Sequence, residues 1–352
     1  MSLFGFSVDL HSATKAQLTN YIELLAKYQK QLIFTSLVGF ANNQELWEKL
    51  AQVTQLAKKY QMFVYATIDQ KFLENYNLTY KKTKELINFF KNKGLAGIKC
   101  DQAFDLTTQT KLTYNNQEFK IIINGSHNLI NLDKLVLEYR INNKNVISCY
   151  NFYQQRYTAA SVDQYLINQY ESHINNIPFA GFVSDKQGCS LEIHRDWSLS
   201  AQIHHLIALG TDVIIVNQFV SETELKLITN IAQKKVTLAV DIIEDISEVE
   251  RKILFDDKNH FVRPDLAQDL FISPIRNEVD KIKVRATNQE YFEVGDVIIC
   301  NENALIDCGQ LQIVTKRIKN DGIRNLVAKI KEPYRSHFLS ELKATRSFKF
   351  IA

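Results

Sequence analysis

The chain has 352 residues, of which 45% are apolar and 23% are charged, and this length exceeds the usual single core, so two domains are expected. The formal charge of +3 is not gathered into a block of lysine and arginine, which argues against a nucleic-acid partner. Five scattered cysteines, no signal-peptide pattern and no apolar run near the ~18 residues of a membrane span predict a soluble, cytoplasmic protein without a membrane partner.

Short β-branched or aromatic runs recur along the first two thirds of the chain: GFSVDL, QLIFTSL, MFVYATI, GIKCD, KIIING, VISCYNFY, FAGFVSD and DVIIVNQ. Between them, segments such as 16–28 and 45–60 carry apolar residues at helical spacing. Strand then helix, repeated about eight times, predicts an α/β fold of the (β/α)₈ or TIM barrel type. The competing fold, an open doubly wound sheet, normally has a glycine-rich phosphate turn after its first strand, and SVDLHSAT contains no glycine.

The alternation of strands and helices ends after about residue 241. Residues 294–330 contain three strand-like runs separated by Gly-Asp and Asn-Asp-Gly turns. We therefore predict a barrel domain over residues 1–241 and a small β-rich domain over residues 242–352. Residues 260–277, in which Pro264 and Pro274 break any long helix, are predicted to link the two.

Barrel enzymes carry their reacting groups at the C-terminal ends of the strands and in the loops that follow. Those positions here hold Asp9, His11, Ser36, Thr67, Asp69, Asp101, Asn124, Ser126, Asn151, Tyr153, Asp185 and Asn217. The stretch SLEIHRDW follows the seventh strand, so Glu192, His194 and Arg195 are predicted on the same face.

Two carboxylates stand out, because Asp101 follows strand four and Glu192 follows strand seven. Glycosidases use such a pair: one acid protonates the leaving oxygen, and the other attacks the anomeric carbon or activates water. Two structural alternatives stay open, with Asp101 as the cap of the next helix and Glu192 in an ion pair with Arg195. His194 and Arg195 are either ligands of an anion or surface residues.

Neither a metal nor a cofactor is expected, since no HExxH, cysteine-rich or carboxylate-rich spacing is present. His204 and His205 are adjacent on a helix and point to different sides, so a structural role is expected for both. An aldolase or isomerase would be expected to show a lysine at a strand end or a metal cluster, and neither is evident.

The segments GFSVDL, IFTSL, GIKCDQAF, CYNFYQQRYTAAS, SLEIHR and VGDVIICNENALIDCGQLQI follow one another along nearly the whole chain. In this order they resemble the 6-phospho-N-acetylmuramidase family. The resemblance implies a (β/α)₈ barrel with a cyclophilin-like β domain. It also implies a cytoplasmic glycosidase that cleaves 6-phospho-N-acetylmuramic acid from N-acetylglucosamine during recycling of cell-wall disaccharides. The expected partner is this phosphorylated amino-sugar disaccharide, and a homodimer is left open.

Carried over residue by residue, the resemblance implies Asp101 and Glu192 as catalytic residues. It implies substrate binding by Asn124, Asn151, Tyr153, His194, Arg195 and Asn217. Other positions depart from the family pattern: Thr67 replaces an aspartate, Tyr150 replaces a histidine, and residues 9–11 replace a Tyr-Pro-acidic segment. These departures indicate a divergent member with an altered substrate. The alternative is a catalytically weakened paralogue that binds a phosphosugar as a sensor or partner protein.

Overall fold

The computed structural model describes residues 3–40, 43–79, 82–100, 111–126, 143–186, 188–231, 236–256, 260–265, 267–273, 282–287, 289–339, 342 and 347–352. The chain divides into two compact units, one of residues 1–206 with 210–230 and one of residues 207–209 with 231–352. The domain boundary expected after residue 241 falls within strand β9 (Val236–Ile242), whose hydrogen-bonded partners are strands β16 and β17 of the second unit.

The strands of the first unit form a closed parallel barrel in chain order: β1 (Leu3–Ser7), β2 (Leu32–Ser36), β3 (Phe63–Ile68), β4 (Gly97–Cys100), β5 (Lys120–Asn124), β6 (Val146–Cys149), β7 (Phe179–Val183) and β8 (Val213–Val216). Strand β1 pairs with β2 on one side and β8 on the other, which closes the barrel. Every strand overlaps one of the predicted runs, because strands covered on both faces require continuous apolar sequence. The predicted (β/α)₈ barrel is confirmed.

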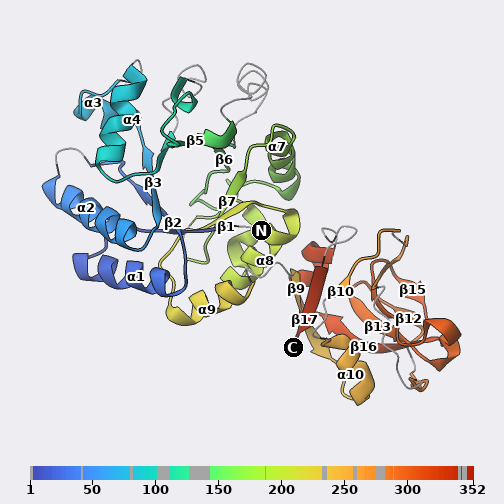
Figure 1. The fold of residues 1–352 in the computed structure, drawn as a ribbon. Coiled ribbons are helices and arrows are strands. Elements are labelled where there is room, and N and C mark those ends of the chain that lie inside the picture. The colour runs from blue at the N-terminus through green and yellow to red at the C-terminus, as the bar shows by residue number, and fades with distance from the viewer. Residues whose placement is uncertain are drawn as a thin grey trace. The chain divides into compact units, whose positions relative to one another are not determined.

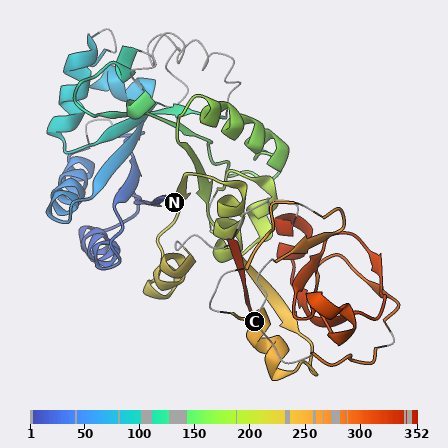
Figure 2. The same cartoon turned by 45° about the vertical axis from the view of Figure 1, so that its right-hand side comes forward.

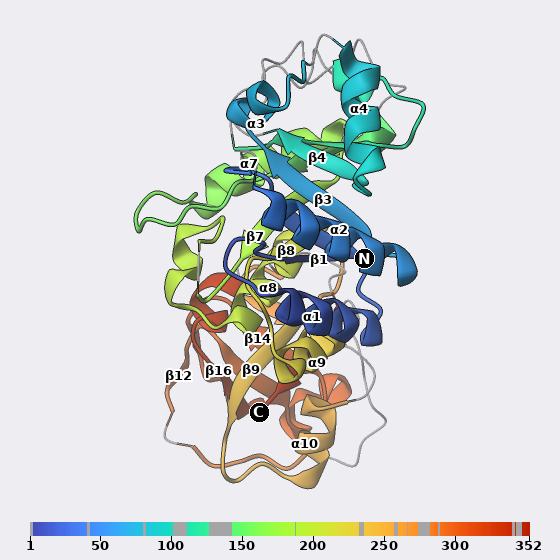
Figure 3. The same ribbon diagram turned by 90° about the vertical axis from the view of Figure 1, so that its left-hand side faces the viewer.

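Helices lie outside these strands (Figures 1 and 3): α1 (Lys15–Lys27), α2 (Gln44–Lys59), α3 (Gln70–Asn75), α4 (Thr83–Asn92), α7 (Val162–Ile174), α8 (Leu199–Leu209) and α9 (Glu222–Ile231). Figure 3 shows α1 and α2 side by side. Side-chain caps start several of them, as where Thr14 and Gln17 form a capping box at α1. The strand-end carboxylate of Asp69 caps α3 by accepting from the Phe72 backbone N–H at 2.8 Å. No helix within the described ranges is long and apolar enough to cross a membrane.

The interior of the barrel is a packed core. Its buried cluster consists of Leu32, Phe34, Tyr65, Ile122, Cys149, Ala180, Phe182, Val213 and Ile215. Alternate residues of each strand point inward, and bulky side chains from several strands fill the space between them. A ligand is therefore expected at the C-terminal end of the strands and in the loops that follow, as in other barrel enzymes.

The second unit is β-rich, as predicted. Its main sheet has the order β10-β17-β9-β16-β13-β14-β11, in which only β9 and β17 are parallel. Besides β9, the strands of this sheet are β10 (His260–Phe261), β11 (Leu270–Ile272), β13 (Asp296–Cys300), β14 (Leu311–Val314), β16 (Arg324–Ile330) and β17 (Ser347–Ile351). Strands β12 (Tyr291–Phe292) and β15 (Ile318–Lys319) form a separate pair, and the unit also contains helix α10 (Glu248–Leu254). Figure 2 shows α10 beside this sheet.

The predicted link over residues 260–277 is wrong for its described part. Strand β10 pairs with β17 and strand β11 pairs with β14, so this stretch supplies the two edge strands of the sheet. Pro264 lies between the two strands, where a proline removes no ladder hydrogen bond. Pro264 therefore lies in a connection inside the second unit.

Candidate active site

A cavity of about 270 Å³ opens among the C-terminal ends of strands β1, β2, β3, β7 and β8. We call it the mouth cavity; its lining residues include Asp9, His11, Phe34, Ser36, Thr67, Phe152, Gln154, Phe182, Asn217 and Gln218. Hydroxyl, amide and carboxylate groups stand there against aromatic walls. Such a lining suits a sugar, whose hydroxyls need hydrogen-bond partners and whose ring faces pack on apolar surface.

Asp9 is the carboxylate among the described residues that line the mouth cavity. It accepts hydrogen bonds from the Ser12 hydroxyl at 2.5 Å and from the His11 backbone N–H at 2.9 Å. Partial burial raises the pKa of Asp9, but these hydrogen bonds outweigh it and leave the pKa below its ordinary value. Asp9 is therefore an ionised acceptor at neutral pH. The strand-end rule located it, but the family motifs assigned it no role.

Asn217 and Gln218 follow β8 and also line the mouth cavity, as predicted for Asn217 from its strand-end position. The Gln218 side-chain oxygen accepts from the Ser184 hydroxyl at 2.7 Å and from the Asp185 backbone N–H at 3.0 Å. These two donors determine which end of the amide is oxygen. The Gln218 Nε2 group is buried and has no hydrogen-bond partner among the described residues. Sequence patterns gave Gln218 no role.

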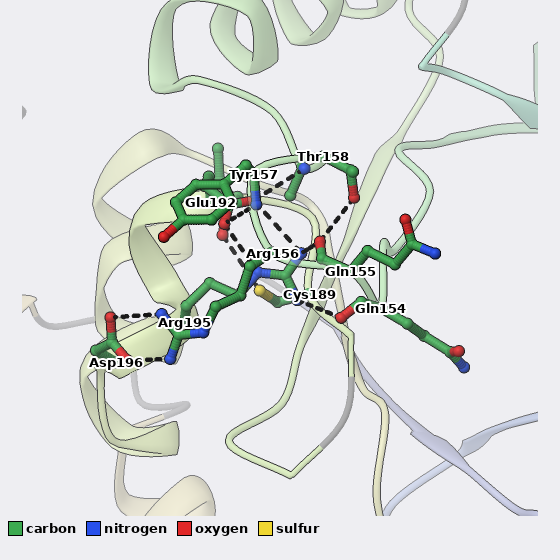
Figure 4. Close-up of polar contacts among 11 residues, drawn as sticks. Gln154, Gln155, Arg156, Tyr157, Thr158, Cys189, Glu192, Arg195 and Asp196 are labelled. Carbon is green, nitrogen blue, oxygen red and sulfur yellow. Dashed lines mark hydrogen bonds and ion pairs between the residues drawn. The ribbon is translucent and has the colours of Figure 1, made fainter.

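Glu192 begins a 3₁₀ turn, η4 (Glu192–Asp196), and both of its carboxylate oxygens hold the β6–α7 loop, residues 150–161 (Figure 4). Oε1 accepts from the Tyr157 backbone N–H at 2.6 Å, and Oε2 accepts from the Ala159 backbone N–H at 2.9 Å. Burial raises the pKa of Glu192, but these N–H groups and Arg195 more than offset it and hold the pKa below its ordinary value.

Arg195 binds the same loop. Its guanidinium donates to Glu192 Oε1 at 3.2 Å, to the Gln154 carbonyl at 3.0 Å and to the Gln155 carbonyl at 2.5 Å. Only 8% of the Arg195 side chain is exposed, against 28% for Glu192. We call these two residues the loop anchor. Because Gln154 lines the mouth cavity, the loop anchor holds the backbone of a residue that forms the cavity wall.

The other predicted site residues are scattered around this region. His194 is fully buried, with its Nε2 2.9 Å from Nδ1 of His205, and it does not line the mouth cavity. Asn124 accepts from the Ser126 backbone N–H at 2.9 Å, and the Ser126 hydroxyl accepts from the Asn151 backbone N–H at 2.8 Å. The ends of β5 and β6 are thereby joined.

Two predicted residues remain. Tyr153 pairs through its backbone N–H with the Cys189 carbonyl at 3.1 Å, which ties the start of the β6–α7 loop to the segment after β7. Asp101, the other predicted catalytic carboxylate, lies outside the described residues. Among the described residues the structure therefore brings Asp9, Asn217 and Gln218 together at the mouth cavity, with Glu192 and Arg195 supporting its wall.

An eight-stranded parallel barrel with polar groups at its mouth, followed by a β-rich unit, defines a two-domain (β/α)₈-barrel protein. A family model described as 6-phospho-N-acetylmuramidase, N-terminal, matches residues 4–230, and one described as 6-phospho-N-acetylmuramidase, C-terminal, matches residues 236–351. The chain belongs to the 6-phospho-N-acetylmuramidase family, whose name denotes a glycoside hydrolase. The predicted resemblance is confirmed.

Two solved structures match over the full chain. A crystal structure of an uncharacterized protein from B. cereus has 26% sequence identity and a TM-score of 0.86, with 100% of each chain covered. A conserved protein of unknown function from Enterococcus faecalis has 20% identity and a TM-score of 0.70, with 100% of this chain and 96% of that chain covered. No curated protein matches the chain.

Proposed function

We propose that this protein is a glycoside hydrolase that releases 6-phospho-N-acetylmuramic acid from N-acetylglucosamine in a cell-wall disaccharide, as a cytoplasmic recycling enzyme. The observation that carries the proposal is the pair of family matches, which together cover residues 4–230 and 236–351. The polar lining and aromatic walls of the mouth cavity support a sugar ligand at the same end of the barrel.

In this proposal Asp101 and Glu192 are the carboxylate pair. A proton donor must hold its proton near neutral pH, and the lowered pKa of Glu192 is opposite to that requirement. We therefore propose Asp101 as the proton donor and Glu192 as the ionised partner. Asn124, Asn151, Tyr153 and Asn217 remain the proposed substrate-binding residues, together with Asp9, Gln218 and Gln154 of the mouth cavity; for His194, buried against His205, we propose only support of the η4 turn.

The direct test is hydrolysis of 6-phospho-N-acetylmuramyl-N-acetylglucosamine, with the unphosphorylated disaccharide beside it and the products identified by mass spectrometry. We expect 6-phospho-N-acetylmuramic acid from the phosphorylated substrate alone. Asp101→Asn should lower kcat about 10²–10⁴-fold, the range for loss of a general acid. A wild-type protein that neither hydrolyses nor binds either disaccharide would contradict the proposal.

A second candidate is a weakened paralogue that binds a phosphosugar without hydrolysing it. One observation favours it: the Glu192 carboxylate already receives hydrogen bonds from Tyr157, Ala159 and Arg195, so its oxygens serve the protein itself. The substitutions at Thr67 and Tyr150 point the same way. Calorimetric binding of the phosphorylated disaccharide without any product would favour this candidate over the hydrolase.

A further inference from the structure

Lys99 is an inward-facing lysine near the end of β4. In the barrel register it lies between Thr67 of β3 and Ile122 of β5. Ile122 belongs to the buried cluster inside the barrel, and Thr67 lines the mouth cavity. Since residues in register on neighbouring strands share a face of the sheet, the Lys99 side chain also points into the barrel, at the level of its mouth.

Lys99 is a largely buried residue, and no described residue supplies a counter-charge to it. Only 5% of its surface is exposed, and within the described part of the chain no carboxylate pairs with its ammonium and no acceptor lies within hydrogen-bond distance. The positive charge of Lys99 also acts on Cys149 of β6. Burial raises the pKa of Cys149 to about 12, and the charge of Lys99 partly offsets this rise. Burying an unpaired ammonium costs free energy of folding, so its presence calls for a compensating partner.

Lys49 is the natural comparison, because it is a second buried lysine in the same unit, 6% exposed. Its ammonium lies 2.9 Å from Glu45 Oε1 and donates to the Leu10 carbonyl at 3.2 Å. The ammonium of Lys49 thus has both of its partners within the protein. Lys99 differs from it in having none among the described residues.

The arginines near the mouth are already engaged. Arg195 donates to Glu192 and to two loop carbonyls, and Arg156 pairs with Asp196 at 2.7 Å. Asp9, which lines the mouth cavity, is ionised and repels an anion. Lys99 thus faces the barrel interior at the level of Thr67, and no described residue neutralises its charge.

We propose that Lys99 is an anion-binding residue of the barrel mouth, whose ammonium binds an anionic oxygen of the sugar ligand. This inference rests on the proposed function for its ligand class, an acidic amino sugar. That sugar offers two anionic groups, a 6-phosphate and a lactyl carboxylate, and an ammonium binds either as a point charge. Sequence analysis passed over this residue: GIKCD holds a lysine one position before the end of the strand.

The test compares wild type with Lys99→Met, Lys99→Arg and the control Lys49→Met, by calorimetric titration with three sugars. N-acetylglucosamine 6-phosphate carries only the phosphate, N-acetylmuramic acid carries only the carboxylate, and N-acetylglucosamine is the neutral reference. We expect wild type to prefer one of the acidic sugars, which identifies the group bound. Lys99→Met should weaken that ligand by about tenfold to a hundredfold, the worth of a hydrogen bond to a charged group, and leave the neutral sugar unchanged.

The arginine variant should retain the preference, because it retains the charge. Thermal unfolding without ligand gives a second measurement: Lys99→Met should melt at or above the wild-type temperature, whereas Lys49→Met should melt below it. The proposal would be overturned if Lys99→Met bound each acidic sugar with the same affinity as wild type. So would a melting temperature of Lys99→Met as low as that of Lys49→Met, which would make Lys99 structural.

The proposal would also be overturned if Lys99→Arg lost the preference for the acidic sugar as completely as Lys99→Met. Arginine replaces the positive charge of lysine but not its nucleophilic amine, so that result would indicate a nucleophile. None of these measurements depends on turnover. A protein that binds the acidic sugar through Lys99 but hydrolyses nothing would contradict the proposed function and leave this inference intact. A protein that hydrolyses the phosphorylated disaccharide with unchanged KM in Lys99→Met would do the reverse.

Discussion

The guanidinium of Arg195 lies 3.2 Å from the carboxylate of Glu192, and both side chains hold the backbone of one loop, far away in sequence. Glu192 accepts two of its N–H groups, and Arg195 donates to two of its carbonyls. The carboxylate of Glu192 thus binds backbone donors of the loop, and the guanidinium of Arg195 binds backbone acceptors of the same loop. Phe152 and Gln154 of the β6–α7 loop line the mouth cavity, so the loop anchor helps to position this part of the cavity wall.

Glu192→Gln should loosen the β6–α7 loop without unfolding the barrel. The new amide N–H₂ group cannot accept a hydrogen bond, so one donor, from Ala159 or Tyr157, loses its partner, at a cost of about 1–3 kcal/mol. We expect hydrogen exchange at whichever of these two amides loses its acceptor to accelerate by about tenfold or more. Asp196→Asn is the control, because its pair with Arg156 is exposed and contributes little. Unchanged exchange in Glu192→Gln would refute the loop anchor.

The loop anchor also predicts a dependence of stability on pH. The pKa of Glu192 in the folded protein lies below its ordinary value of 4.5, so its stabilising effect is fully present above pH 4.5. It declines as the pH falls further and is lost below the folded-state pKa. Wild type should therefore lose more stability than Glu192→Gln on acidification below pH 4.5, as measured by urea unfolding at a series of pH values. Parallel pH curves would contradict this.

Asp9→Asn should weaken sugar binding without regard to charge on the ligand. Ionised Asp9 accepts hydrogen bonds, and an amide in its place accepts weaker ones. We expect N-acetylglucosamine and its 6-phosphate to lose affinity by a similar factor, about tenfold or less. Calorimetry of both sugars checks this. A selective gain for the 6-phosphate would mean that Asp9 acts mainly by repelling the anion.

Glu250→Gln should destabilise the second unit strongly. Glu250 is 1% exposed, forms an ion pair with Arg285 and accepts from the Asn325 amide at 2.9 Å. Removing one partner of a buried ion pair costs about 3–5 kcal/mol. The control Glu293→Gln removes an exposed pair with Arg317 and should cost about 1 kcal/mol or less. Urea unfolding of both variants makes the comparison, and equal losses would contradict it.

The sequence predicted the barrel well because each strand and helix has a local signature. A run such as MFVYATI is apolar on both faces, and the helix after it shows its own periodicity, so neither depends on distant residues to be recognised. The β-rich character of the second unit followed from its turns in the same way. The edge strands β10 and β11 were not predicted, because strands of two or three residues are too short to show a periodic pattern.

The site was predicted less completely. The strand-end rule placed Asp9, Thr67 and Asn217 at the mouth, where the structure has them. It also predicted His194 on the same face, whereas the ring of His194 is buried against His205. The rule locates a backbone position relative to the barrel, but it does not determine the direction of a side chain in a 3₁₀ turn.

The sequence by itself determined the order of the elements, the barrel and the end of the barrel where polar groups gather, because those depend on local periodicity and on the direction of parallel strands. Only the tertiary structure decided which of these groups are available to a ligand. Glu192 and Arg195 are engaged by a loop some forty positions away, whereas Lys99 is turned into the barrel with no protein partner among the described residues. Availability depends on contacts between residues distant in sequence, which no local pattern encodes.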